Sequence, residues 1–268
     1  MSSSRPPAVA GTFYPADARI LSQDVRALLD AASTSPHHPK ALIVPHAGYM
    51  YSGAIAASAY AALRSIASRI TRVVLLGPTH RVAVRGLALP ACDSFTTPLG
   101  SIALDTTAMH ELASLPQVVV SDKVHALEHS LEVQLPFLQM TLGRFTLLPL
   151  AVGDARKEEV AEVLERVWGG DETLIVISSD LTHYLPYEVA QTMDRHTTQD
   201  ILALRPALSH ELACGATPIN GLLLAARKHG LLAHLLDLRN SGDTAGPHDA
   251  VVGYAAFAFT GEDGHAGR

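Results

Sequence analysis

The sequence predicts an α/β fold in which a central mixed sheet, mostly parallel, is flanked by helices. Short apolar runs of strand length alternate along the chain with segments of helical periodicity, as a parallel sheet requires. Three of the apolar runs end in polar residues, at His46, at His80, and at Asp180 with His183. Ligands of open α/β sheets bind at the carboxyl ends of strands, so these runs predict one shared cleft of the metal-binding type.

The composition indicates a single domain over residues 1–268. A hydrophobic content of 48% in 268 residues allows a substantial core, and the polar end, residues 260–268, is expected to be a flexible tail. The net charge of -6 and the absence of a Lys/Arg cluster exclude a nucleic-acid surface. Two cysteines are too few for a disulfide framework, and no apolar segment reaches the length of a membrane span or signal peptide. We therefore expect a cytoplasmic protein that binds neither nucleic acid nor membranes.

The first part of the chain is expected to place two histidines on one edge of the sheet. The strand before His46, an alanine-rich helix and the strand before His80 form a β-α-β unit, whose two strands run parallel. The proline-rich segment that precedes them cannot continue a helix, and it is expected to be extended. The expected elements are an extended arm at 5–15, a helix at 17–32, a loop at 35–40, strands at 41–46 and 73–80, and a helix at 52–67.

The middle of the chain contains a possible second source of cleft residues. Residues 84–105 alternate short apolar runs with Gly and Pro, which predicts a β-hairpin, and a helix is expected at 106–115. His125, His129 and Glu132 then follow at helical spacing i, i+4 and i+7. If their helix crosses the edge of the sheet, His129 and Glu132 point into the cleft.

The last part of the chain supplies the third polar strand end and closes the sheet. The apolar segment at 173–180 ends at Asp180, with His183 three residues later. A glycine-rich loop precedes a final strand, and its residues reach the cleft only if that strand is antiparallel to the others. The expected elements are strands at 145–154, 173–180 and 250–259, and helices at 157–168, 187–204 and 220–236.

The best candidates for metal ligands are His46 and His80, because neutral imidazole is the commonest protein ligand and each residue sits on a short loop braced by proline. Asp243, or less favourably His248, is expected to complete the set from the loop before the last strand. Two histidines and one carboxylate bind Fe(II) with positions left open for oxygen and substrate, and zinc accepts the same ligands.

Three further residues are candidates for catalytic roles. His183 is a candidate general acid or base, because histidine is the side chain most often used for that role, and Asp180 can orient a histidine or hold a substrate group, or merely cap a helix. His129 joins them if its helix reaches the cleft. A competing motif is HALEH, His125 to His129, which matches the H-x-x-E-H pattern of inverted zinc peptidases with Glu128 as general base.

Several motifs together resemble the Memo family, the B component of the AmmeMemoRadiSam set. They run from Arg5 to Phe259 in the family's order: RPPAVAGTFYP, VPHAGYMYSG, LGPTH, EHSLEVQLPFLQ, SSDLTHY, CGATPI and SGDTAG with VVGYAAFAF. The resemblance implies a fold similar to class III extradiol dioxygenases, which are non-haem iron enzymes, and a possible functional link to a radical SAM partner protein. The family's cleft histidines match His46, His80 and His183, and its aspartate matches Asp180.

One departure from the family concerns sulfur. Animal members place a cysteine in the loop before the last strand, where this chain has Ser241, Gly242, Asp243 and Thr244. The difference argues against a thiolate copper or redox site and in favour of a carboxylate ligand. EHSLEVQLPF also looks like the dioxygenase segment D-H-x-x-x-V-P-L, which supports a place for His129 in the cleft.

Three functions are consistent with these residues. The first is a metal-dependent oxidoreductase, dioxygenase-like, that binds Fe(II), or else zinc or copper, and acts on a small molecule. The second is an adaptor that receives a peptide or partner protein in the same cleft without catalysis. The third is a zinc hydrolase that uses HALEH and Glu128.

Overall fold

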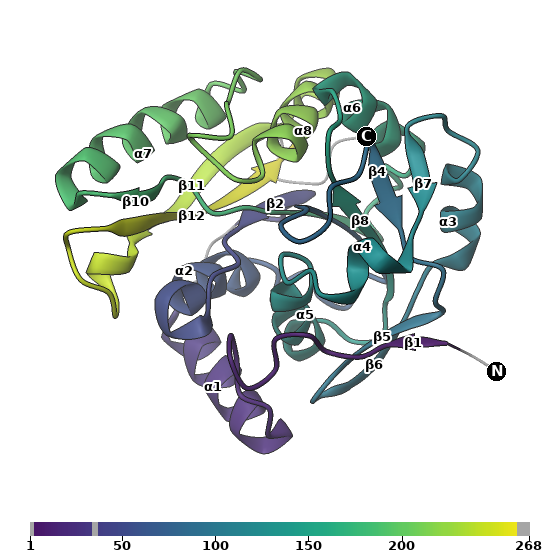
Figure 1. The fold of residues 1–268 in the computed structure, drawn as a ribbon, viewed down its shortest axis with the longest axis horizontal. Helices are drawn as coiled ribbons and strands as arrows, with labels where there is room; N and C mark the ends of the chain where they lie inside the picture. Colours follow the sequence, from purple (N-terminus) through teal and green to yellow (C-terminus); the bar gives the residue numbers. More distant parts are fainter. Residues whose placement is uncertain (1–2, 34–36, 262–268) are drawn as a thin grey trace.

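Four parallel strands form the centre of the main sheet. The computed structural model describes residues 3–33 and 37–261, and Figure 1 shows their arrangement. The parallel strands are mostly apolar and buried, with polar residues at their ends, as expected for strands covered on both faces. They lie side by side in the order β2 (Ala41–Val44), β9 (Thr173–Ser178), β3 (Arg72–Pro78) and β8 (Thr146–Val152).

Antiparallel strands extend this sheet on both sides. Next to β2 lies β12 (Val251–Thr260), which also pairs with β11 (Leu232–Asn240) and with β10 (His183–Leu185). On the other side, β8 pairs antiparallel with β4 (Leu87–Leu89), which continues in parallel to β7 (Val118–Val120). The described residues thus form a nine-stranded mixed sheet. Its antiparallel last strand brings the loop before β12 to the same edge as the carboxyl ends of β2, β3 and β9.

Helices cover the two faces of the sheet. In Figure 1, α1, α2 and α5 lie on one side of it, and α6, α7 and α8 lie on the other. The α/β fold with a mixed, largely parallel sheet between helices is therefore confirmed. The helices are α1 (Ala18–Ala31), α2 (Tyr49–Ala61), α3 (Thr106–Leu112), α4 (Asp122–Ala126), α5 (Leu135–Thr141), α6 (Lys157–Arg166), α7 (Tyr187–Leu202) and α8 (Ala216–Lys228), with short 3-10 helices η1 (Glu132–Gln134) and η2 (Ser241–Asp243).

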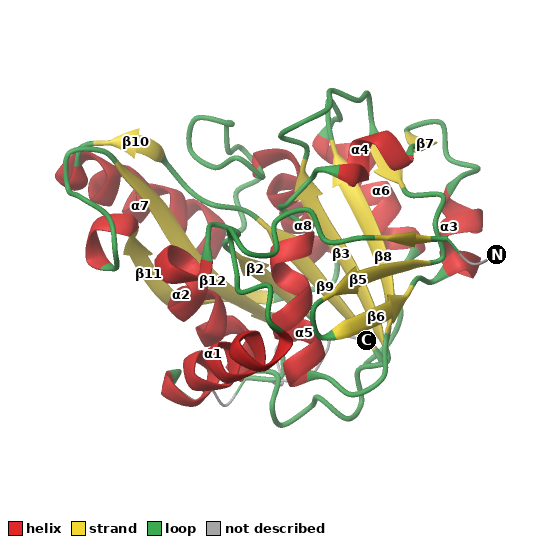
Figure 2. Cartoon of the chain, turned by 60° about the horizontal axis from the view of Figure 1, so that its bottom comes forward, coloured by secondary structure: helices red, strands yellow, loops and turns green. Residues whose placement is uncertain are grey.

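A small second sheet holds the N-terminal arm. It consists of β1 (Ser4–Arg5), β5 (Ser94–Thr97) and β6 (Gly100–Ala103), and β5 and β6 form the hairpin expected in this region. Figure 2 shows it beside α5, at the end of the molecule where the N-terminus lies. From β1 the arm continues along the loop that carries His129, because Arg5 donates hydrogen bonds to the carbonyl oxygens of His125 and Glu128.

Two expected helices are wrong. Residues 220–236 do not form one helix, because α8 ends before Gly230, which has φ +63°, and the chain then turns into β11 to pair with β12. His125, His129 and Glu132 do not share a helix either, since α4 ends at Ala126. Just beyond it, the Glu128 carboxylate accepts a hydrogen bond from the Ser130 amide at 2.9 Å, a local contact that competes with helical pairing.

The expected tail at 260–268 largely lies outside the described residues, although Thr260 is the buried last residue of β12. Among the residues described, no helix combines the length and the apolar character needed to cross a bilayer.

Candidate metal centre

His46 and His80 occupy equivalent places on two parallel strands. Each follows its strand, β2 or β3, by two residues, and in each case a proline ends or follows the apolar run. β9 lies between the two strands in the sheet, yet the two imidazole rings meet above its end, with centroids 5.2 Å apart and an interplanar angle of 74°. The strand ends therefore converge as the parallel arrangement requires.

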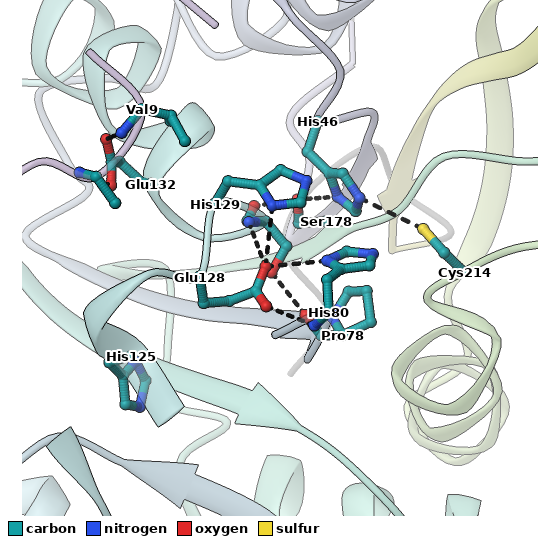
Figure 3. Close-up of polar contacts among 12 residues, drawn as sticks. Val9, His46, Pro78, His80, His125, Glu128, His129, Glu132, Ser178 and Cys214 are labelled. Carbon is teal, nitrogen blue, oxygen red and sulfur yellow. Dashed lines mark hydrogen bonds and ion pairs between the residues drawn. The ribbon is translucent and has the colours of Figure 1, made fainter. Parts of the chain in front are cut away.

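His129 supplies a third imidazole from the loop between α4 and η1. Its ring centroid lies 5.5 Å from that of His46 and 4.7 Å from that of His80. One ring nitrogen from each histidine can be chosen so that all three lie within 4.8 Å of one another. Three imidazoles facing one point (Figure 3) form a group that can hold a divalent metal ion.

The tautomer of His46 follows from its neighbours. The Ser178 hydroxyl donates its only proton to the Ser130 carbonyl at 2.6 Å, so it must accept the hydrogen bond from His46 Nδ1 at 2.9 Å. His46 Nε2 is then unprotonated, and without a metal it can accept a hydrogen bond from the Cys214 thiol, whose sulfur lies 3.4 Å away. Burial, with a smaller contribution from His80, lowers the pKa of His46 to about 3, which keeps the ring in the neutral form that a metal binds.

Glu128 orients His80 in the same way. Its buried carboxylate accepts hydrogen bonds from His80 Nδ1 at 2.9 Å and from the His80 backbone amide, so the neutral tautomer of this ring presents Nε2 to a metal. Burial alone raises the pKa of Glu128, but the hydrogen bonds from His80 and Ser130 outweigh it and bring the pKa down to about 2. A carboxylate behind a histidine is a common support for metal ligands.

His129 Nδ1 is a buried polar atom that forms no hydrogen bond among the described residues. Glu128 Oε1 lies 3.4 Å away, close enough for an electrostatic contact but not for a directed hydrogen bond. Burial lowers the pKa of His129 to about 4, so this ring is also neutral near pH 7. A metal ion at this site would therefore meet two uncharged ligands in His46 and His129.

Cys214 was not expected at this site, yet its sulfur lies 3.4 Å from His46 Nε2. It comes from the loop before α8 and also accepts a hydrogen bond from the Asp180 amide at 3.3 Å. The loop before the last strand has no cysteine, which argues against a thiolate site, but Cys214 brings a thiol to His46 from a different loop. Burial and the Asp180 carboxylate raise the pKa of the Cys214 thiol to about 12, so the sulfur is protonated unless a metal binds it.

Asp243, the expected carboxylate ligand, lies outside the group of three histidines among the described residues. Its Oδ2 accepts a hydrogen bond from the Asn240 amide at 2.8 Å in a capping box at η2, and its Oδ1 accepts one from the Tyr187 hydroxyl. His248 stacks on Tyr187, with ring centroids 4.4 Å apart. Both residues thus hold the loop before β12 in place, and His129 takes the third position.

The HALEH motif and Glu132 also serve other contacts. His125 Nε2 donates a hydrogen bond to the Ala88 carbonyl at 2.9 Å, and its ring points away from the three histidines in Figure 3. Glu132 is fully buried and accepts hydrogen bonds from Arg5, the Tyr14 hydroxyl and two amides of the arm. Since both Glu128 oxygens are bound to His80, the zinc-peptidase arrangement is absent among these described residues.

Asp180 and His183 lie on the cavity that opens above the histidines. Asp180 is buried and its Oδ1 accepts a hydrogen bond from the His46 amide at 2.7 Å; burial raises its pKa despite that bond. His183 begins β10 and is half-buried. The cavity has a volume of about 610 Å³. Its walls are Phe13, His46, Ala47, Gly48, Tyr51, His80, Arg81, His129, Asp180, His183, Tyr184, Ser241, Gly246, Pro247, Ala250, Val252 and Tyr254.

Comparison with known proteins identifies the family. The profile of the Memo-like proteins matches residues 5–258, almost the whole chain. The chain belongs to the Memo family. The matched span includes all three histidines of the candidate centre and Cys214.

Relatives of this Memo family chain cover nearly its full length. It is 36% identical to a MEMO1 family protein of Ignicoccus hospitalis, over 95% of this chain and 98% of that protein. It is 38% identical to a MEMO1 family protein of Methanosarcina acetivorans, over 94% and 98%. The crystal structure of the uncharacterized protein JW3007 from Escherichia coli K12 is similar in fold, with a TM-score of 0.51 at 14% identity, over 81% of this chain and 98% of that one.

Proposed function

We propose that this Memo family protein is a metal-dependent oxidoreductase that acts on a small molecule in the cavity, with Fe(II) as its metal. The observation that carries the proposal is the set of three imidazoles, His46, His80 and His129, which line the cavity and whose nitrogens lie within 4.8 Å of one another. The unpaired, buried His129 Nδ1 and the supports behind His46 and His80 fit a bound ion better than a purely structural cluster.

The ion would supply open coordination positions and a redox-active centre, which three protein ligands leave available. The chain's own residues account for the remaining steps. Ser178 and Glu128 hold the two histidines with Nε2 left for a metal, and Asp180 fixes the His46 backbone. His183, on the cavity wall, is the residue we assign to hold the proton that a substrate hydroxyl releases.

Metal content under anaerobic conditions tests the proposal. The protein, stripped with a chelator and reloaded with Fe(II), Zn(II) or Cu(II), is expected to bind about one ion per chain by elemental analysis. His80→Ala and His129→Ala should each lower that stoichiometry or the affinity at least tenfold, whereas His110→Ala, an exposed histidine on α3, should not. Equal metal binding by the wild type and the His80 and His129 variants would contradict the proposal.

The position of Cys214 favours a second candidate, a thiolate-containing copper centre. A metal bound to His46 Nε2 lies within reach of a sulfur that is 3.4 Å from this atom, and soft sulfur ligands select copper. The variant Cys214→Ser separates the two candidates. If the protein is the iron-dependent oxidoreductase that we propose, its affinity for Fe(II) should change by no more than a few-fold. Loss of copper binding with unchanged iron binding would favour the second candidate.

A further inference from the structure

Charge is unevenly distributed over the cavity. Of the described residues that line it, Arg81 and Asp180 carry the formal charges, and they differ in depth. Asp180 is buried beside His46, whereas Arg81 follows His80 and is exposed. In the described part of the chain, the Arg81 guanidinium forms no hydrogen bond and no ion pair. The cavity therefore has hydrogen-bond acceptors on its floor and a free cation at its rim.

The walls between floor and rim are aromatic. Phe13, Tyr51, Tyr184 and Tyr254 all line the cavity, and Phe13 packs on His129 with ring centroids 4.8 Å apart. Tyr254 is only 2% exposed, and its hydroxyl makes no hydrogen bond within the described residues. Since this hydroxyl is on the cavity wall and has no protein partner there, it is available to a ligand in the cavity.

Tyr184 is held in an unfavourable conformation at the same place. Its backbone has φ 57°, in the left-handed region that bulky residues avoid, and its side chain is 76% exposed. The register of the β10–β12 pair shifts between His183 and Leu185, so this conformation belongs to an irregularity of the strand pair. The Tyr184 ring is left exposed on the cavity wall, where a ligand can cover it.

We propose that the cavity binds a small organic anion with an aromatic body, whose carboxylate or phosphate pairs with Arg81 while its other end faces the three histidines. The guanidinium fork matches both anions in geometry. The polarity of the cavity sets the orientation, because the buried Asp180 carboxylate repels an anion from the floor. Any reaction of this anion at the histidines rests on the proposed function, whereas the binding of the anion in the cavity does not.

Arg81 also lines a second cavity of about 610 Å³, which runs along residues 78–84 to His210 and Cys214. The two cavities share His80 and Arg81 but differ in their other lining residues. Ala250 lines only the one that contains the three histidines, and Ala83 lines only the second. Both alanines are exposed, so each can be replaced by tryptophan to fill the cavity it borders.

Fluorine NMR of the metal-free protein tests the proposal with three probes: 4-fluorobenzoate, 4-fluorophenyl phosphate and the neutral 4-fluorobenzamide. At least one anion should bind about tenfold more tightly than the amide, and the tighter of the two identifies the anionic group. Arg81→Gln should remove that preference and Arg81→Lys should retain part of it. Arg85→Gln, which removes the same charge from an exposed position outside both cavities, should leave it intact.

The tryptophan variants locate the bound probe. Ala250→Trp should abolish anion binding, while Ala83→Trp should not affect it. Equal binding of anions and amide, an unchanged preference in Arg81→Gln, or loss in Ala83→Trp alone would overturn the inference. Because the probes are measured without metal, Arg81-dependent binding in a protein that takes up no metal would refute only the proposed function.

Discussion

Two of the three site histidines are oriented by residues that lie behind them. Ser178 accepts a hydrogen bond from His46 Nδ1, and Glu128 accepts one from His80 Nδ1, so the Nε2 atom of each ring is the one left for a metal. Glu128 thus acts as a positioning residue, although its place in HALEH suggested a general base. The distinction matters because a positioning carboxylate affects metal affinity, whereas a general base affects only turnover.

Glu128→Gln should therefore weaken metal binding 10- to 100-fold, as is usual when the carboxylate behind a ligating histidine is removed. The amide still fits the space but cannot accept two hydrogen bonds from His80 with the strength of a carboxylate. Titration calorimetry with Zn(II) measures the change. Asp243→Asn is the matched control, since that carboxylate caps η2; a larger loss in the control than in Glu128→Gln would restore Asp243 as the ligand.

The sequence was sufficient to predict His46 and His80, because their positions depend only on where two parallel strands end. The role of His129 as third imidazole could not be derived in this way, since its loop reaches the site through contacts with the arm. Cys214 is 168 residues from His46 in the chain, and nothing local to it indicates that contact. Asp243 lies outside the group of three histidines, and its carboxylate caps Asn240 only three residues away, a local role that its position in the loop did not predict.

Among the elements, the N-terminal arm has the closest connection with the site. Arg5, Tyr14 and the amides of Ala8 and Val9 converge on the carboxylate of Glu132, which is fully buried. Arg5 also binds the carbonyl oxygen of Glu128, and Phe13 packs on His129. The prolines of the arm predicted that it is extended. They did not predict that it binds Glu132, because helical spacing suggested a place in the cleft for that residue.

Glu132→Gln should destabilise the protein by about 3 kcal/mol or more, because it leaves the Arg5 guanidinium buried without its counter-charge. Urea unfolding, followed by circular dichroism, gives the free energy of unfolding. Glu188→Gln on the exposed face of α7 removes the same charge and should cost less than about 0.5 kcal/mol. Similar values for both variants would show that the buried ion pair contributes nothing specific to the fold.

For the molecule as a whole, buried histidines determine how stability responds to acid. Burial lowers the pKa of His125 and His129 from 6.5 to about 4, so the folded protein binds fewer protons than the unfolded chain within this range. The contribution of these two histidines to the free energy of unfolding is therefore fully present above pH 6.5 and is lost as the pH decreases towards 4. Glu128 adds to the loss below its ordinary pKa of 4.5. Asp194 acts in the opposite direction, since burial raises its pKa from 3.8 to about 6 and favours the folded state in acid.

The free energy of unfolding of the metal-free protein should consequently decline between pH 6.5 and pH 4. His125→Gln removes one of the titrating groups without touching the three site histidines, so it should flatten the pH dependence even if it lowers stability at neutral pH. Urea titrations at several pH values measure both. A pH dependence as steep in the variant as in the wild type would contradict the role assigned to His125.

The place of β12 in the sheet has a consequence for biosynthesis. This strand is the last of the described elements in chain order, yet it lies inside the sheet, between β2 on one side and β10 and β11 on the other. Val252 and Tyr254 of this strand line the cavity. While the ribosome is still making the chain, His46, His80 and His129 have already emerged, but the wall beside them has not. A nascent chain thus exposes its histidines before it can enclose a ligand. The topology therefore determines that a metal ion could reach the histidines before the cavity wall has formed.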